Sequence, residues 1–174
     1  LFRSTEIVSA DLRGCICVHT TTAGTKGLLV PDHSAEVLTG SFVNAEAIVS
    51  YIVQTGTETV NLYYTDNGHP EHEDFLCARY LENRLRTLHG GDSITEESGK
   101  VVDSVTGPGD REDDFSAIAQ TLRAGRGRDI IESYKAPESD IDYCLMLNKF
   151  PFVLRRKTSN DLAYPFEIER VDVL

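Results

Sequence analysis

The chain has 174 residues, which suits one domain with a hydrophobic core of its own. Its formal net charge of −11 argues against binding to nucleic acid or to an anionic membrane surface. The charge does not exclude a small anionic ligand, because a phosphate site is built from local donors. No run approaches the roughly 20 apolar residues that a membrane-spanning helix needs. We therefore expect neither nucleic acid nor a membrane as a partner.

The first half of the chain alternates segments typical of strands with segments typical of helices. Short runs rich in β-formers predict the strands. Apolar residues at i, i+3, i+4 and i+7 from Ala45 predict the clearest helix. The expected order is strand 15–19, helix 26–30, strand 36–39, helix 45–52, strand 59–64 and helix 71–88. Successive βα units with short connections predict an α/β fold with a mainly parallel sheet.

The second half is less regular and predicts a helical portion followed by an edge strand. The expected elements are a loop at 90–114, a helix at 115–123, a Gly-Arg-Gly-Arg break at 125–128 and a helix at 139–147. Because Pro151 precedes residues 152–154, we expect an edge strand there. Residues 155–174 form a polar tail with scattered β-formers, which can pair with a sheet edge.

The four cysteines are expected to be buried free thiols in a reducing cytoplasm. Cys15 and Cys17 lie two residues apart, so on a strand both would point to the same face. A Cys-x-Cys pair can begin a metal site, but no second Cys/His pair with ligand spacing follows it. We therefore expect no metal at these thiols.

A polar turn follows the first predicted strand, with the sequence T-T-A-G-T-K at residues 21–26. Exposed N–H groups at a helix start favour an anion, and Gly24 lets the backbone approach it closely. Hydroxyl groups and the ammonium group of Lys26 add donors. The candidate phosphate ligands are Thr21, Thr22, Gly24, Thr25 and Lys26. The alternative interpretation is a plain capped turn between a strand and a helix.

A second turn, G-S-F-V-N-A at residues 40–45, follows the second predicted strand. Ser41 and Asn44 are candidate substrate-binding residues, because both carry groups that can donate to a ligand. The alternative is structural, with Ser41 ordering the turn and Asn44 capping the next helix.

Carboxylates crowd the start of the helix predicted at 71–88. Glu73 and Asp74 complement the helix dipole, which is a sufficient structural reason for them. Adjacent carboxylates are also what Mg²⁺ selects, so both residues are candidate metal ligands and catalytic groups. His69 and His72 lie nearby, but zinc would need a third ligand that the sequence does not offer. Because ligands bind at the carboxyl ends of strands in open α/β sheets, the three motifs are expected to line one crevice.

These motifs, in this order, resemble the 2-phosphosulfolactate phosphatase family over residues 4–154. T-T-A-G-T-K at 21–26 is similar to the family's T-T-N-G-T-R, and residues 40–45 match its G-S-F-x-N-A fully. Glu73 and Asp74 are similar to its E-D motif, and D-I-D-Y-C at 140–144 resembles a late motif. The resemblance implies a cytoplasmic phosphatase with an α/β fold, which removes phosphate from a small acidic substrate in coenzyme M biosynthesis.

The resemblance also implies a Mg²⁺ cofactor and a role for each motif. Glu73 and Asp74 would hold Mg²⁺ or orient water, residues 21–26 would cradle the phosphate, and Ser41 and Asn44 would position the substrate. Three positions depart from the family pattern: Ala23 replaces an asparagine, Lys26 replaces an arginine, and Arg79 stands where the family tends to have glycine.

The opening motifs of the family have no counterpart in this sequence. We therefore expect residues 1–154 to form a phosphatase-like domain without its N-terminal part, and 155–174 to form a tail. A second copy or a partner chain would then supply the missing portion, so an oligomer is expected. The alternative function is that of a catalytically inactive, phosphatase-like structural or interaction subunit.

Overall fold

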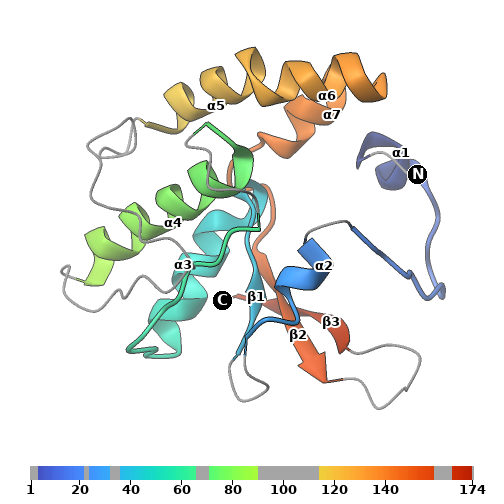
Figure 1. Ribbon diagram of the computed structural model, residues 1–174. Helices are drawn as coiled ribbons and strands as arrows, with labels where there is room; N and C mark the ends of the chain where they lie inside the picture. Colours follow the sequence, from blue (N-terminus) through green and yellow to red (C-terminus); the bar gives the residue numbers. More distant parts are fainter. Residues whose placement is uncertain are drawn as a thin grey trace.

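The fold is a three-stranded sheet with helices packed beside it and above it (Figure 1). It is seen in a computed structural model, which describes residues 4–21, 24–31, 36–65, 71–89, 114–158 and 166–173. The strands are β1 (Leu38–Thr39), β2 (Phe152–Thr158) and β3 (Phe166–Asp172). The helices are α1 (Ser4–Ser9), α2 (Gly24–Gly27), the 3-10 turn η1 (Phe42–Asn44), α3 (Ala45–Gln54), α4 (Glu73–His89), α5 (Asp114–Ala124), α6 (Arg126–Tyr134) and α7 (Glu138–Cys144).

The sheet is antiparallel throughout, so the mainly parallel sheet predicted from the sequence is wrong. The strand order is β1-β2-β3, and both pairings are antiparallel. In the register Arg155 lies opposite Leu38 on one side and opposite Glu169 on the other. The guanidinium of Arg155 forms a 2.6 Å ion pair with Glu169, which stabilises this register. The edge position predicted for residues 152–154 holds only in part, because Phe152 and Val153 pair with β3 alone, whereas Leu154 also pairs with Thr39 of β1.

Two of the expected strands do not form in the described part of the chain. Residues 15–19 and 59–64 have no strand partner, and the side chain of Ile16 is 92% exposed. A run of β-formers indicates an extended backbone, but the partner of a strand is decided by tertiary packing. The segment at 36–39 does contribute β1, which pairs with β2 rather than with another βα unit.

The helices are predicted better than the strands. The helices expected at 45–52, 71–88 and 115–123 are confirmed as α3, α4 and α5, and the one at 139–147 is confirmed over α7. The short helix near 26–30 is α2, which begins and ends earlier than expected. Helices α1 and α6 have no counterpart in the prediction. The loop expected at 90–114 lies, except for Asp114, outside the described residues.

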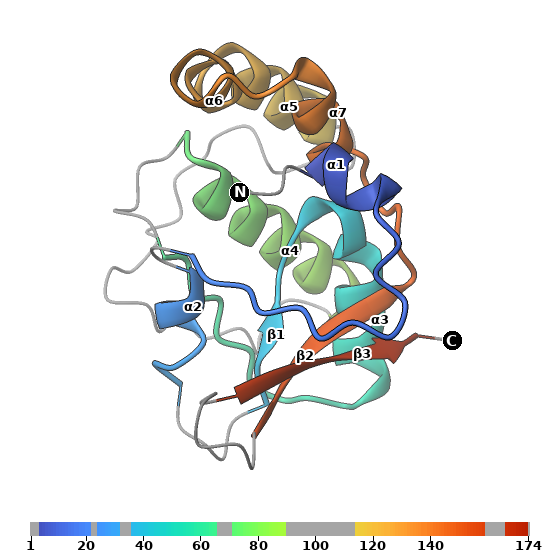
Figure 2. The same cartoon turned by 90° about the vertical axis from the view of Figure 1, so that its right-hand side faces the viewer.

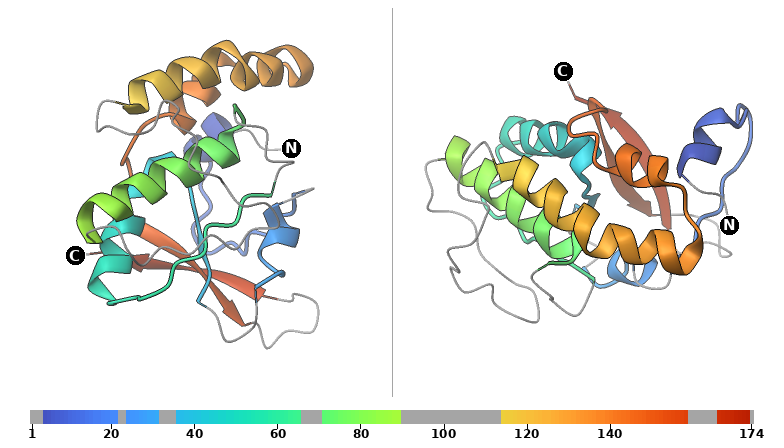
Figure 3. Two further views of the ribbon diagram at one scale, coloured as in Figure 1. Left: turned by 60° about the vertical axis from the view of Figure 1, so that its left-hand side comes forward. Right: turned by 90° about the horizontal axis from the view of Figure 1, so that it is seen from above.

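Helix α4 lies between two apolar clusters and contributes to both. The first cluster joins α3, α4 and β2 through Ala45, Ala47, Ile48, Val49, Ile52, Leu81, Leu85 and Val153. The second joins η1, α4 and α5 through Phe42, Leu76, Ile118 and Leu122. Figure 3 shows α5 and α6 following one another end to end above the rest of the chain. The start of α4 is therefore held against the helices that lie above it.

The N-terminal helix α1 is attached to α7 by a buried carboxylate. The backbone N–H and the hydroxyl of Thr5 both donate to Oδ1 of Asp140, at 3.0 and 2.6 Å. From α1 an exposed segment, residues 10–21, runs to α2 (Figure 2). Within the described residues, no helix combines the length and the apolar character that crossing a membrane requires.

A charged network joins the strands to α3. Arg155 donates to Glu36 at 3.0 Å and to the hydroxyl of Tyr51 at 3.1 Å, and Tyr51 itself donates to Glu36. Burial alone would raise the pKa of Glu36, but the hydrogen bonds from Tyr51 and Arg155 outweigh it, and the pKa lies below its ordinary value. The same network raises the pKa of Arg155, which stays charged at all relevant pH values.

Candidate functional site

The predicted phosphate turn is closed by its own threonines. The backbone N–H of Thr25 donates to Oγ1 of Thr21 at 3.0 Å, and Oγ1 of Thr25 donates to the carbonyl oxygen of Thr21 at 2.8 Å. These bonds are what a capped turn would make. Gly24 and Lys26 are exposed, and Lys26 makes no ion pair with the described residues. Thr22 lies outside the described residues.

Helix α2 packs closely against the segment that precedes α4. A Cβ atom at Gly27 would lie 2.4 Å from Cγ2 of Thr65 and 3.5 Å from Cε1 of Tyr63. Only a residue without a side chain allows so close an approach. Gly27 therefore places the predicted phosphate turn directly beside Thr65.

Thr65 in turn binds the carboxylate of Asp74. Its backbone N–H and its hydroxyl both donate to Oδ2 of Asp74, at 3.2 and 2.8 Å. Two donors on one oxygen fix the orientation of the half-buried carboxylate and leave Oδ1 without a hydrogen bond from the described residues. Thr65 thus contacts both Asp74 and the last residue of α2, so the structure brings the helix that follows the predicted phosphate turn close to Asp74.

Glu73 points to a different partner. Its Oε2 lies 3.6 Å from Nε of Arg126, the first residue of α6. Neighbouring residues on a helix do not face each other, which explains why Glu73 and Asp74 contact different groups. The sequence analysis did not propose Arg126 as a site residue. The two charges in the Gly-Arg-Gly-Arg break were the signal that could have found it.

The carboxylates of Glu73 and Asp74 fit one kind of metal site. Mg²⁺ commonly takes one or two protein carboxylates and completes its shell with water and substrate phosphate. Oδ1 of Asp74, which accepts no hydrogen bond from the described residues, suits that role, whereas the half-exposed Glu73 pairs with Arg126. Within the described residues, no three His, Cys, Asp or Glu side chains gather as a metal site. The donor set fits Mg²⁺ with few protein ligands, and it does not fit zinc, which needs three or four. His69 lies outside the described residues.

Cys77 lies one helical turn after Asp74. Burial, together with the smaller effect of the Asp74 charge, raises the pKa of its thiol to about 12. The thiol stays protonated at neutral pH and is not a nucleophile. The other three cysteines, Cys15, Cys17 and Cys144, are exposed, so the expectation of four buried thiols is wrong.

The G-S-F-V-N-A turn is built into the core beside α4. Phe42 packs at 6.0 Å from the ring of Tyr80 and at 5.3 Å from that of Phe115. Residues 148–150 wrap around this turn, since the N–H groups of Asn148 and Phe150 donate to the carbonyls at positions 42 and 43.

Asn44 does not cap α3 with its side chain. Its Nδ2 donates to the carbonyl oxygen of Phe152 at 3.3 Å, and the cap is supplied by Asn148, which accepts the N–H of Glu46 at 2.9 Å. Asn44 is 4% exposed, and its Oδ1 is buried without a partner in the described residues. Ser41 accepts the N–H of Asn44 with its backbone carbonyl. The substrate roles of Ser41 and Asn44 stay predictions.

The sequence profile of the 2-phosphosulpholactate phosphatase family matches residues 4–159. The chain belongs to this family. The match includes every motif described above, from the turn at 21–26 to the segment at 140–144. Family membership supports a phosphatase site, and the role of each residue within it stays a prediction. No solved structure matches the chain significantly.

Individual relatives are distant. Over 91 residues the chain is 26% identical to a probable 2-phosphosulfolactate phosphatase of Clostridium beijerinckii, covering 52% of this chain and 38% of the relative. The corresponding protein of Clostridium acetobutylicum is 28% identical over 94 residues, covering 52% and 40%. That of Caldanaerobacter subterraneus is 25% identical over 152 residues, covering 87% and 60%. The chain thus spans between 38% and 60% of the length of these relatives.

Proposed function

We propose that the chain carries the phosphate and metal site of a Mg²⁺-dependent phosphomonoesterase, which acts on a small acidic substrate such as 2-phosphosulfolactate. Family membership supports the phosphatase class. The observation that carries the proposal is the continuous contact from Gly27 through Thr65 to Asp74, because Gly27 ends α2, the helix that contains Gly24, Thr25 and Lys26 of the phosphate motif. The place in coenzyme M biosynthesis and the cytoplasmic location stay predictions.

The groups at the site suit this hydrolysis. A bound Mg²⁺ ion would neutralise charge on the phosphoryl oxygens. Asp74 would hold it with Oδ1, while Thr65 keeps the carboxylate oriented through Oδ2. Thr25, Gly24 and Lys26 would contact the phosphate, although α2 has a single turn and contributes donors rather than a helix dipole.

In the reaction, water attacks phosphorus and forms the new P–O bond. The bond from phosphorus to the ester oxygen breaks, and the alcohol leaves with a proton. Glu73 would accept the proton that the attacking water loses, and the departing alcohol oxygen would take up a proton from the same carboxyl or from solvent.

The test is release of inorganic phosphate from 2-phosphosulfolactate by the chain, with Mg²⁺ and after its removal by a chelator. We expect Asp74→Asn to lower kcat at least about a hundredfold, as loss of a metal-binding or catalytic carboxylate does. Glu132→Gln is the matched control, because this carboxylate is exposed on α6 and pairs only with Arg128 in the described structure. Hydrolysis that persists in Asp74→Asn, or without any divalent cation, would contradict the assignment.

One observation favours the alternative, a phosphatase-like interaction subunit. Ile16 and Val18 are 92% and 67% exposed on the segment that leads to α2. Exposed apolar residues grouped in this way are typical of surfaces that another chain covers. A chain of this kind would form a stable complex, as a homo-oligomer or with a partner chain, and would release no phosphate. Native mass spectrometry together with the phosphate assay separates the two functions.

A further inference from the structure

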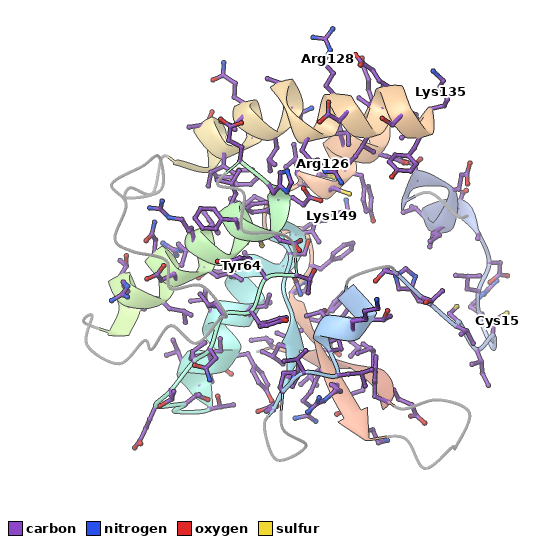
Figure 4. All side chains as sticks on the ribbon, viewed as in Figure 1. Cys15, Tyr64, Arg126, Arg128, Lys135 and Lys149 are labelled. Atoms are coloured by element: carbon purple, nitrogen blue, oxygen red, sulfur yellow. The ribbon has the colours of Figure 1, made fainter. Side chains whose placement is uncertain are left out.

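Arg126 joins the start of α6 to the start of α4 (Figure 4). The distance of 3.6 Å between its Nε and Oε2 of Glu73 makes this contact an ion pair, but it is too long for a hydrogen bond. The Nε atom is also buried without a hydrogen-bond partner in the described residues. Arg126 therefore has a charge partner at the site, while its Nε makes no hydrogen bond with the described residues.

Close packing at Gly127 fixes the start of α6, from which Arg126 projects. Gly127 is buried, and a Cβ atom there would lie 2.7 Å from the carbonyl oxygen of Leu122 and 3.2 Å from Cγ2 of Ile141. The absence of a side chain lets α6 begin directly against α5 and α7. Arg128, two residues further on, projects from the opposite side of α6 (Figure 4).

The phosphate turn lacks the kind of donor that recognises phosphate most specifically. Lys26 offers a compact ammonium charge, whereas a guanidinium can bind two phosphate oxygens at once. Arg126 supplies a guanidinium at the carboxylate next to Asp74. Its side chain is 38% exposed and that of Glu73 is 47% exposed, so both side chains are partly open to solvent, although Nε of Arg126 is buried.

We propose that Arg126 binds the phosphate group of the substrate, and that Glu73 holds Arg126 in position when no phosphate is bound. The inference rests on the proposed phosphatase function and names a residue of the same site. Binding exchanges one long ion pair for charge-assisted hydrogen bonds to phosphate, which are the stronger contacts. It also releases Glu73 for the role in hydrolysis proposed above.

The test is calorimetric titration of the metal-free chain with inorganic phosphate. Arg126→Gln is expected to weaken binding about tenfold or more, as the loss of a charged hydrogen-bonding partner does. Glu73→Gln is expected to strengthen binding several-fold, because it frees Arg126. The two substitutions break the same ion pair and yet change the affinity in opposite directions. In the Arg126→Gln background, Glu73→Gln should have much less effect, which separates the release of Arg126 from a general loss of negative charge.

Arg128→Gln removes the same charge from the other side of α6 and should leave phosphate affinity unchanged. Arg126→Lys keeps the positive charge but lacks the planar guanidinium, so it should bind phosphate with intermediate affinity. The unfolding transition of this variant is measured to check that the fold is intact. An Arg126→Gln protein that is folded and binds phosphate as tightly as the wild type overturns this inference alone. A wild-type chain that neither binds nor releases phosphate overturns the proposed function as well.

Discussion

The contact between Gly27 and Thr65 is the structural link of the proposed site, and Gly27→Ala tests it. The added Cβ would lie 2.4 Å from Cγ2 of Thr65, a distance that carbon atoms do not reach, so α2 or Thr65 must move. Overpacking costs about 1–3 kcal/mol, while Gly to Ala in a helix gains about 0.5–1 kcal/mol. We expect a net loss of about 0–2 kcal/mol in the free energy of unfolding, with weaker phosphate binding where α2 is displaced.

Thr65→Ser supplies the matched background for this experiment. Serine removes Cγ2, the atom that would clash, and keeps the hydroxyl that donates to Asp74. In that background Gly27→Ala should be neutral or stabilising, and the coupling between the two positions should reach about 1 kcal/mol. Urea unfolding of the four proteins, followed by circular dichroism, measures it. An equal cost of Gly27→Ala in both backgrounds would refute the contact between α2 and Thr65.

Two further predictions follow from the pKa values. Glu36→Gln should cost at most about 1 kcal/mol at neutral pH, because the network is partly exposed. Burial opposes the lowered pKa of Glu36, but the hydrogen bonds from Tyr51 and Arg155 prevail. The contribution of ionised Glu36 to the free energy of unfolding is fully present at pH values above the ordinary glutamate pKa of about 4.3. It disappears as the pH falls through the lowered pKa of Glu36, and urea unfolding at several pH values measures this loss. Because the pKa of its thiol is about 12, Cys77 should resist iodoacetamide at mildly alkaline pH until the chain unfolds. The exposed Cys15 should react in the native state. Mass spectrometry of the labelled peptides measures both reactions.

The helices could be predicted because their evidence is local. The stripe that begins at Ala45 marks one face of α3, and Ala45, Ile48, Val49 and Ile52 are all buried there. The helix α6 was missed because its sequence, R-G-R-D-I-I-E-S-Y, begins with a glycine between two charges. Gly127 is unfavourable for an isolated helix, and its packing against Leu122 and Ile141 compensates for that cost only in the folded chain.

The sheet could not be predicted from the same kind of evidence. The apolar runs at 15–19 and 59–64 have the composition of strands, yet neither pairs with a strand in the described structure. The strands that do pair, β2 and β3, contain several charged residues, and the ion pair between Arg155 and Glu169 across them is visible only once the register is known. Composition indicates which segments can be extended, whereas the choice of partner depends on residues far away in the sequence.

The candidate site shows the same division between local and distant evidence. The motifs at 21–26 and 73–74 were recognisable, but Thr65 and Arg126, which contact the two carboxylates, were not among the predicted site residues. Their importance lies in what they contact, since Thr65 orients the carboxylate of Asp74 and Arg126 forms an ion pair with Glu73. If both act as proposed, each of the two carboxylates is controlled by a neighbour outside its own motif. Substitutions at positions 65 and 126 should then alter the site while leaving every family motif intact.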